Sequence, residues 1–227
     1  MKILAIIPAY DAEESLAEVI DGLFEYGFKS RDILVVDDGS SDRTSEIAHA
    51  KGVSVISHPA NKGKGAALKT GFKYAIDEDY DAVLTLDADM QHPPEYALKF
   101  IETATETGAD VVIGNRLDDL STMPFHRRFS NLTTTFFVRV WTGKRIGDSQ
   151  CGYRFIKTDI LKKINLRTNY YQTETEFILE AARNGAEFAS VPVPTIYNDF
   201  DSKMNPLIET FRFIGVMLAH PFRRRNG

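Results

Sequence analysis

The stretch Ile3-Leu4-Ala5-Ile6-Ile7, followed at once by Pro8-Ala9-Tyr10-Asp11, is a continuous apolar run that ends in a polar loop. Such a run is typical of a strand that is covered on both faces of a sheet. It is too short for a signal peptide, and no other stretch reaches the ~18 apolar residues that a membrane span needs. We therefore expect a protein that is soluble or peripherally bound to a membrane, and intracellular.

Apolar runs and amphipathic segments alternate as far as Arg116. Further strands are predicted at 33–36, 53–57, 82–86 and 111–114, and helices at 15–26, 44–51, 65–76 and 95–107. Gly52 and Gly108 stand where left-handed helix caps are expected. Strands that alternate with helices in this way form a parallel sheet with right-handed crossovers. The predicted fold class is therefore α/β, a mostly parallel sheet sandwiched by helices.

The alternation becomes irregular in the second half of the chain. Residues 117–131 are predicted to be loop-like, and they are followed by helices at 132–142 and 174–184 and a strand at 188–193. No internal repeat and no Gly/Ser-rich linker separates the two halves. We expect the second half to fold over the first as a lid, so that residues 1–203 form one domain.

The composition limits the classes of partner. The chain has 227 residues, with 27 Lys and Arg against 32 Asp and Glu, which gives a net charge of −5. A protein that follows nucleic-acid phosphates is expected to be basic, so no nucleic-acid partner is predicted. The single cysteine, Cys151, excludes an intrachain disulfide and a multi-cysteine metal cluster, and it indicates a reducing compartment.

Ligands of open α/β sheets bind at the carboxyl ends of the strands, where this sequence places several acidic loops. Asp87 and Asp89 follow the predicted strand 82–86, and two carboxylates so placed can converge on one divalent cation. A diphosphate would supply further oxygens, and Gln91 and His92 are additional candidate ligands. The alternative is a polar loop in which one aspartate caps the next helix.

Two other polar loops leave alternatives open. Asp37 and Asp38 either accept hydrogen bonds from a nucleotide base or ribose, or belong to an acidic turn in which Asp42 caps the next helix. The run Asn61-Lys62-Gly63-Lys64-Gly65 is either a phosphate-facing helix start or a solvated turn. Its spacing is not that of a P-loop, and no G-x-G-x-x-G, G-x-S-x-G or H-E-x-x-H motif is present.

Taken together and in order, these motifs resemble the family-2 inverting glycosyltransferases with the GT-A fold. The similarity is closer to the dolichol-phosphate mannosyltransferase and polyprenyl-phosphate glycosyltransferase group, and it covers about residues 3–203. The motifs that carry it are Ile6-Ile7-Pro8-Ala9-Tyr10, Val35-Val36-Asp37-Asp38-Gly39-Ser40, Asn61-Lys62-Gly63-Lys64-Gly65, Asp87-Ala88-Asp89-Met90-Gln91-His92-Pro93-Pro94, Gly114-Asn115-Arg116 and the later Cys151-Gly152-Tyr153-Arg154.

The resemblance implies transfer of a hexose, with inversion, from a nucleotide sugar of the GDP-mannose or UDP-glucose type to a dolichyl or undecaprenyl phosphate. Asp87, Asp89 and Gln91 would bind Mg²⁺ or Mn²⁺. Residues implied to hold the nucleotide sugar are Pro8, Tyr10, Asp11, Glu14, Asp37, Asp38, Lys64, Asp87, Ala88 and Asp89. Those implied to hold acceptor or phosphate are Arg116, Arg127, Arg128, Ser130 and Lys203, and the catalytic set is Asp89, Arg116, Arg128, Asp148 and Arg154.

Two stretches depart from the pattern of the family. Asp11-Ala12 stands where Asn-Glu is common, so Glu13 or Glu14 is a candidate substitute for the ribose contact. Of a later Arg-x-x-Gly-x-Ser-Lys motif, only Ser202-Lys203 is kept.

The chemistry of the acceptor decides which side chains the reaction needs. A sugar hydroxyl must lose a proton to a general base, for which Asp148 is the candidate. A phosphomonoester is mostly ionised at neutral pH, since its second pKa is about 6, and it needs cations for positioning instead. Transfer to a sugar hydroxyl in glycan synthesis therefore remains the alternative activity.

The C-terminal segment 204–227 is apolar and aromatic from Leu207 to Phe222 and then carries Arg223-Arg224-Arg225. It either lies in a membrane interface, which would place the enzyme at the cytoplasmic face of a membrane, or packs as a terminal helix on the core or a partner.

Two other classes of protein are alternatives to a glycosyltransferase. A sugar-nucleotide pyrophosphorylase would carry a Gly-rich, Arg-containing loop in place of Pro8-Ala9-Tyr10-Asp11. A non-catalytic nucleotide-sugar-binding protein is disfavoured by the intact Asp87/Asp89 pair.

Overall fold

The computed structural model describes residues 1–118, 123, 125–196 and 206–219, with the backbone alone at 126, 206–211 and 219. Within these residues the chain forms one seven-stranded sheet in the order β3-β2-β1-β4-β6-β5-β7. The strands are β1 (Ile3–Ala9), β2 (Ile33–Asp37), β3 (Ser54–Ser57), β4 (Ala82–Thr85), β5 (Val111–Asn115), β6 (Arg154–Lys157) and β7 (Phe188–Pro192). All neighbouring strands are parallel except β6, which runs antiparallel to both β4 and β5.

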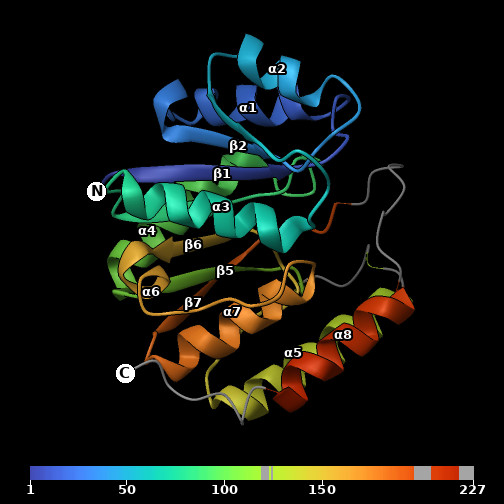
Figure 1. Ribbon diagram of the computed structural model, residues 1–227. Coiled ribbons are helices and arrows are strands. Elements are labelled where there is room, and N and C mark those ends of the chain that lie inside the picture. The colour runs from blue at the N-terminus through green and yellow to red at the C-terminus, as the bar shows by residue number, and fades with distance from the viewer. Residues whose placement is uncertain (119–122, 124, 197–205, 220–227) are drawn as a thin grey trace.

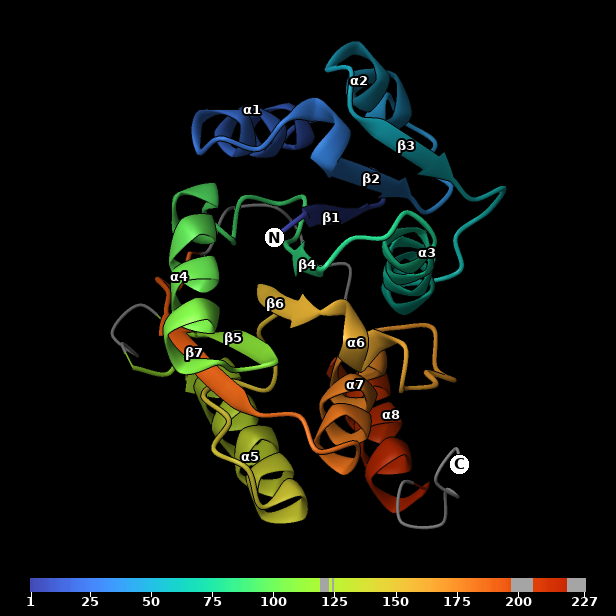
Figure 2. The same ribbon diagram turned by 90° about the vertical axis from the view of Figure 1, so that its left-hand side faces the viewer.

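Helices cover both faces of the sheet (Figures 1 and 2). They are α1 (Leu16–Glu25), α2 (Thr44–Ala50), α3 (Lys64–Asp77), α4 (Ala97–Thr107), α5 (Phe125–Thr142), α6 (Thr158–Leu161), α7 (Gln172–Arg183) and α8 (Pro206–Ala219), with 3-10 turns η1 (Ser30–Asp32) and η2 (Pro94–Tyr96). Figure 2 shows α1 and α4 on one face and α3, α6 and α7 on the other. The α/β fold class predicted from the sequence is confirmed.

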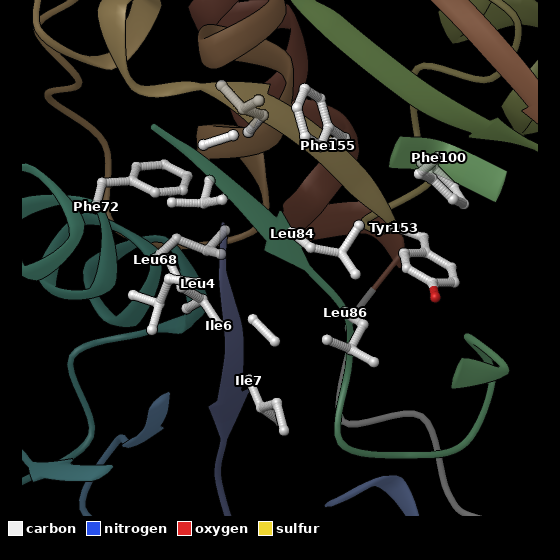
Figure 3. Packing of buried hydrophobic residues seen from close by; sticks show 14 of the residues in the cluster. Leu4, Ile6, Ile7, Leu68, Phe72, Leu84, Leu86, Phe100, Tyr153 and Phe155 are labelled. Carbon is white, nitrogen blue, oxygen red and sulfur yellow. The ribbon is translucent and has the colours of Figure 1, made fainter. Parts of the chain in front are cut away.

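The core lies between β1 and the helices on either side of it (Figure 3). Every residue from Leu4 to Ile7 is fully buried, as expected for the apolar run that predicted this strand. Gly71 lets α3 approach closely, because a Cβ added there would lie 2.6 Å from the Ile6 side chain. On the α4 side, the rings of Phe100 and Tyr153 stack with their centroids 4.3 Å apart.

The sequence-based boundaries are confirmed to within a few residues in the first half of the chain. Gly52 and Gly108 have positive φ angles of 71° and 72°, as their positions after helices predicted. The largest error concerns 117–131, because α5 begins at Phe125 rather than at Leu132. Phe125, Phe129 and Leu132 have helical spacing, but they face outward and so gave no signal of burial.

The second half of the chain does more than cover the first. It supplies β6, which lies between β4 and β5, and β7, which pairs with β5. The four-residue strand β6 was not predicted, since Arg154-Phe155-Ile156-Lys157 is short and polar at both ends. Its register places Arg154 opposite Thr85, so the motif that precedes β6 comes to lie beside the end of β4.

Candidate active site

The carboxyl ends of β1, β2 and β4 meet at one edge of the sheet, where the predicted acidic loops come together. Asp87 follows β4 by two residues, and the backbone N–H of Leu86 still bonds to the carbonyl oxygen of Ile6 on β1. The hydroxyl of Thr85 donates to the carbonyl oxygen of Gly152 at 2.7 Å. This bond fixes the loop that leads into β6 against the loop that carries Asp87.

Four charged side chains form a chain of alternating sign at this edge. The Lys64 Nζ lies 2.6 Å from the Asp87 carboxylate and 2.7 Å from the Glu174 carboxylate. Glu174 also accepts from the Arg154 guanidinium at 3.2 Å. Lys64 comes from the start of α3, Glu174 from α7 and Arg154 from β6, so three distant segments converge on the β4 loop.

The electrostatics of this chain keep Asp87 and Lys64 charged. Burial alone would raise the pKa of Asp87, but the Lys64 ammonium outweighs it, and the pKa falls to about 2. Burial would likewise lower the pKa of Lys64, but the carboxylates of Asp87 and Glu174 hold it above its ordinary value. Asp87 therefore presents a permanent negative charge at the edge of the sheet.

Asp89 lies in a different environment although it is only two residues away. Burial, together with the charge of Asp87, raises the pKa of Asp89 to about 6. Its carboxylate accepts the backbone N–H of Gln91 at 3.0 Å, and Met90 between them has a positive φ of 61°. Two carboxylates that repel one another and share one loop form a place where a cation relieves the repulsion.

His92 is held neutral beneath this loop. Its Nδ1 accepts the backbone N–H of Asp87 at 3.0 Å, and burial lowers its pKa to about 4. The proton of the ring is therefore on Nε2, which lies 3.9 Å from the Cys151 Sγ. His92 thus uses the lone pair of Nδ1 to orient the Asp87 backbone. A metal ion would need this same lone pair, so His92 is not placed to act as a ligand.

Gly152 is required by the closeness of these groups. A Cβ at this position would lie 3.0 Å from the Lys64 Nζ, 3.2 Å from the His92 ring and 3.3 Å from the Asp87 carboxylate. A side chain there would crowd Lys64, His92 and Asp87, which would have to shift by a few tenths of an ångström.

The donor set fits a small divalent cation that is shared with a substrate. Among the residues that the structure describes, no group of three or more His, Cys, Asp and Glu side chains could hold a metal ion. Mg²⁺ is commonly held by only one or two carboxylates, with substrate phosphates and water completing its shell. Asp87 and Asp89, with Gln91 beside them, are the residues that would hold it.

The loops after β1 and β2 are fastened to each other by the acidic side chains predicted to hold the nucleotide. Asp37 accepts the backbone N–H of Ser40 at 2.9 Å and also its hydroxyl, and the Ser40 Oγ in turn accepts the backbone N–H of Asp11 at 2.9 Å. The Asp11 carboxylate accepts the backbone N–H of Ser41 at 2.9 Å. Asp42 accepts the N–H of Thr44 at 2.9 Å, but the N-cap of α2 is Arg43, so the prediction that Asp42 caps this helix was wrong by one residue.

Asp38 organises the start of α3. Its carboxylate, which is buried, accepts the backbone N–H groups of Lys62 and Gly63 at 3.0 and 2.7 Å and contacts the His58 Nδ1 at 2.6 Å. A carboxylate of the protein therefore lies where an incoming phosphate would meet these amides. The remaining predicted nucleotide-site residues line the same edge: Pro8 is half-buried, Ala88 is buried, and Tyr10 and Glu14 are exposed.

The predicted phosphate-binding arginines differ in exposure. Arg116 follows β5 and is mostly buried, and its Nε donates to the fully buried Asp148 carboxylate at 2.7 Å, which raises the pKa of Arg116 against the effect of burial. Arg154 is also buried and donates to the carbonyl oxygens of Ser149, Cys151 and Glu174. Arg154 therefore supports the loop instead of facing solvent.

The rest of the acceptor set lies on or near α5. Arg128 and Ser130 are exposed and Arg127 is half-buried on the first turns of that helix, whereas Lys203 falls outside the described residues. The structure thus brings Asp87, Asp89 and Lys64 together and places Arg127 and Arg128 on a separate helix.

Glu174 is the member of the site that the sequence analysis missed. It shares one face of α7 with Phe177, Ile178 and Ala181, all of which are buried. An acidic residue on an otherwise apolar helical face was a signal of a buried ion pair, but its partners Lys64 and Arg154 are distant in sequence.

Comparisons with known proteins agree with this geometry. The family model described as Glycosyl transferase family 2 matches residues 4–165. A UDP-N-acetylglucosamine–dolichyl-phosphate N-acetylglucosaminyltransferase of Methanococcus voltae is 31% identical, with 87% of each chain covered. An undecaprenyl-phosphate mannosyltransferase of Micrococcus luteus is 30% identical, with 90% of this chain and 88% of the relative covered.

A solved structure shows the same fold. Glucosyl-3-phosphoglycerate synthase of Mycobacterium tuberculosis, in complex with Mn²⁺, UDP and glucosyl-3-phosphoglycerate, matches with a TM-score of 0.76 and 20% identity. The match covers 100% of this chain and 82% of that one. With the GT-A fold, the acidic loop after β4 and these relatives all in agreement, the chain is a glycosyltransferase that belongs to glycosyl transferase family 2.

Proposed function

We propose that the chain transfers a sugar from a nucleotide sugar to a polyprenyl phosphate at the cytoplasmic face of a membrane, with Mg²⁺ or Mn²⁺ as cofactor. The observation that carries the donor side is the pair Asp87 and Asp89, held at the carboxyl edge of the sheet beside Lys64. The names of the relatives support the acceptor, since one acts on dolichyl phosphate and another on undecaprenyl phosphate.

The donor half of the site is prepared for a diphosphate. A divalent cation at this site would supply positive charge that stabilises the leaving nucleoside diphosphate. The residues that would hold it are Asp87 and Asp89, with Gln91 as a neighbour. Lys64 keeps Asp87 ionised before the donor arrives, and its ammonium lies where it can also attract the incoming phosphates.

The residues proposed to bind the acceptor, Arg116 and Asp148, suit a phosphate nucleophile better than a hydroxyl. Asp148 was the candidate base for a hydroxyl acceptor, yet its side chain is completely buried and paired with Arg116. A base must come within hydrogen-bond distance of the proton that it removes. An ionised phosphate needs no such base, and Arg116 can orient it through the planar guanidinium.

The experiment that tests this proposal is a donor and acceptor screen. UDP-N-acetylglucosamine, GDP-mannose and UDP-glucose, each labelled in the sugar, are incubated with the protein, Mn²⁺ or Mg²⁺ and a short polyprenyl phosphate. We expect one donor to pass label into the organic phase, and we expect EDTA to abolish the transfer. Label that passes only to a sugar hydroxyl acceptor would overturn the lipid-phosphate proposal.

A further inference from the structure

The threonines of α5 bond in two different ways. The hydroxyls of Thr134 and Thr142 donate to carbonyl oxygens of their own helix, as the hydroxyls of helical threonines commonly do. Thr135 is only 1% exposed, and its hydroxyl oxygen instead accepts the backbone N–H of Ser149 at 3.0 Å. The hydroxyl oxygens of Thr135 and Ser149 also lie 3.0 Å apart. One buried side chain of α5 therefore holds a segment that is distant in space from the rest of the helix surface.

This segment, residues 146–151, is fixed on both sides, and we call it the 146–151 loop. On the side of α5, Arg139 donates to two carbonyl oxygens at the start of the loop. On the side of the sheet, a Cβ added to Gly147 would lie 2.7 Å from the Ser190 Oγ on β7 and 2.9 Å from the Asn115 side chain on β5. The loop is thus packed tightly between α5 and the sheet.

Two buried contacts lead from Ser149 toward the candidate active site. Its neighbour Asp148 is fully buried and accepts the Arg116 Nε–H at 2.7 Å. The carbonyl oxygen of Ser149 accepts an N–H of Arg154 at 3.1 Å, and Arg154 pairs with Glu174. The loop therefore joins α5 to an arginine on the acceptor side and to the chain of charges on the donor side.

The two contacts differ in how strongly they depend on the position of the loop. Besides its bond to Ser149, Arg154 donates to two further carbonyl oxygens and to a carboxylate, which help to keep it in place. The acid that pairs with Arg116 is Asp148, whose second oxygen accepts the backbone N–H of Gln150 in the same loop. A displaced loop would carry Asp148 with it, so Arg116 would move more than Arg154.

We propose that Thr135 is a positioning residue for sugar transfer, because it fixes the loop that carries Asp148, and Asp148 holds Arg116. This proposal rests on the proposed function, in which the Arg116 guanidinium orients the acceptor phosphate. Without the Thr135 hydroxyl, the N–H of Ser149 would be buried without its partner, which disfavours the present position of the loop. A displacement of about 1 Å in a group that positions a substrate can cost on the order of 100-fold in rate.

The first measurement is kinetic and uses three variants of the full chain. Thr135→Val keeps the shape of the side chain without the hydroxyl, and Thr135→Ser keeps the hydroxyl. The matched control is Thr134→Val, on the same helix, because the Thr134 hydroxyl bonds within that helix. Transfer from the donor identified in the screen to farnesyl phosphate is followed over a range of acceptor concentrations. Donor binding is measured separately by calorimetry, without acceptor.

The second measurement does not depend on catalysis. The Nε–H groups of Arg116 and Arg154 donate to Asp148 and to the carbonyl oxygen of Cys151, respectively. Their hydrogen exchange, followed by NMR, reports whether each bond is kept. The two signals are assigned by their loss in Arg116→Lys and Arg154→Lys.

We expect Thr135→Val to raise the KM for farnesyl phosphate on the order of ten-fold and to speed exchange of the Arg116 Nε–H by about as much. Exchange of the Arg154 Nε–H and the affinity for the donor should change much less, because Arg154 keeps its other bonds. Thr135→Ser and Thr134→Val should behave as the wild type does.

Three results would overturn the proposal. The first is an unchanged acceptor KM and unchanged Arg116 Nε–H exchange in Thr135→Val. The second is no recovery in Thr135→Ser, which would assign the effect to packing. The third is equal weakening of donor and acceptor binding, which would indicate general loosening of the fold.

Two further outcomes are separable from these. If Thr135→Val does not fold, Ser149→Ala takes its place, since it removes the hydroxyl pair and keeps the backbone N–H bond. An unchanged acceptor KM and unchanged Arg116 Nε–H exchange in Ser149→Ala would equally overturn the proposal. No transfer to farnesyl phosphate by the wild type would contradict the proposed function, and the Arg116 Nε–H exchange would still test the link from Thr135.

Discussion

At the scale of single residues, the Asp89 carboxylate that is proposed to bind the cation also lowers the stability of the folded protein at neutral pH. Its folded pKa of about 6 lies above the ordinary value of 3.8, so the folded state binds the proton more tightly than the unfolded state between these values. Stability from this group is complete below about pH 4 and is lost as the pH rises through 6. We therefore predict that Asp89→Asn raises the free energy of unfolding of the metal-free protein at pH 7 by roughly 1–3 kcal/mol. Denaturant unfolding of the variant and the wild type measures this difference.

The same variant should lose transfer activity by on the order of 100-fold or more, because one of the two carboxylates for the cation is gone. His92 contributes a pH dependence of opposite sign, since its pKa is lowered to about 4, but it does so in both proteins and cancels in the comparison. Addition of Mn²⁺ should raise the melting temperature of the wild type more than that of the variant. Equal stabilisation of both proteins by Mn²⁺ would exclude Asp89 as a ligand.

Gly152 provides a second test at this scale. A methyl group at Gly152 would lie 3.0 Å from the Lys64 Nζ, so Gly152→Ala should displace Lys64 or Asp87 by a few tenths of an ångström. We predict that donor turnover falls on the order of ten-fold or more, while the melting temperature changes little. Gly215→Ala is the matched control, because nothing lies within 4 Å of a Cβ added there. Unchanged kinetics in Gly152→Ala would show that the Lys64–Asp87 contact is not needed for transfer.

At the scale of elements, the contact between α3 and α7 depends on Gly65. A Cβ there would lie 1.9 Å from the Thr173 Oγ1 and 2.7 Å from the Tyr170 carbonyl oxygen, so the helices would have to separate. We predict that Gly65→Ala destabilises the protein by about 1–3 kcal/mol, measured by urea unfolding. Adding Thr173→Ala should restore only part of the loss, since the Tyr170 backbone remains in place. Additive effects of the two substitutions would contradict direct contact.

The elements that the sequence predicted well are those whose signal is local. β1 and β2 are continuous apolar runs. Gly108 ends α4 in the left-handed conformation, as its position after the helix predicted. β6 could not be predicted because four residues carry too little periodicity, and its place between β4 and β5 is a long-range property. The start of α5 was missed because its apolar stripe faces away from the core.

In the candidate site, too, the residues that are close in sequence were predicted, and the contacts between distant segments were not. Asp87 and Asp89 lie on one loop after β4, so their spacing offered a cation site as one of two interpretations, and the family resemblance favoured that one. The glycines of the 61–65 motif were assigned either to a phosphate-facing helix start or to a solvated turn, whereas Gly65 is required by packing against Thr173. The link from Lys64 to Glu174 joins α3 to α7 and depends on the tertiary fold.

At the scale of the whole molecule, the order of the strands has a consequence for how the chain folds. β6 separates β5 from β4, so residues 1–115 contain the pairs among β1, β2, β3 and β4 but leave β5 without a neighbour. When only this part of the chain has left the ribosome, the helices of the first half can form, but the sheet is still incomplete. Completion waits for residues 154–192, and pairings between such distant segments are slow to form.

The last step of folding should therefore be the insertion of a strand between two that are already made. In refolding experiments we expect the β1–β2 amides to gain protection from hydrogen exchange before those of β5, and both before the Lys64–Glu174 link forms. Co-expressed fragments 1–116 and 117–227 should associate into a soluble particle, whereas fragment 1–116 alone should expose an unpaired β5 edge and aggregate. Protection of β5 in the isolated first fragment would contradict this sequence of events. The Lys64–Glu174 ion pair joins α3 to α7, so the charged groups beside Asp87 are complete only after residues 154–192 have been added to the chain.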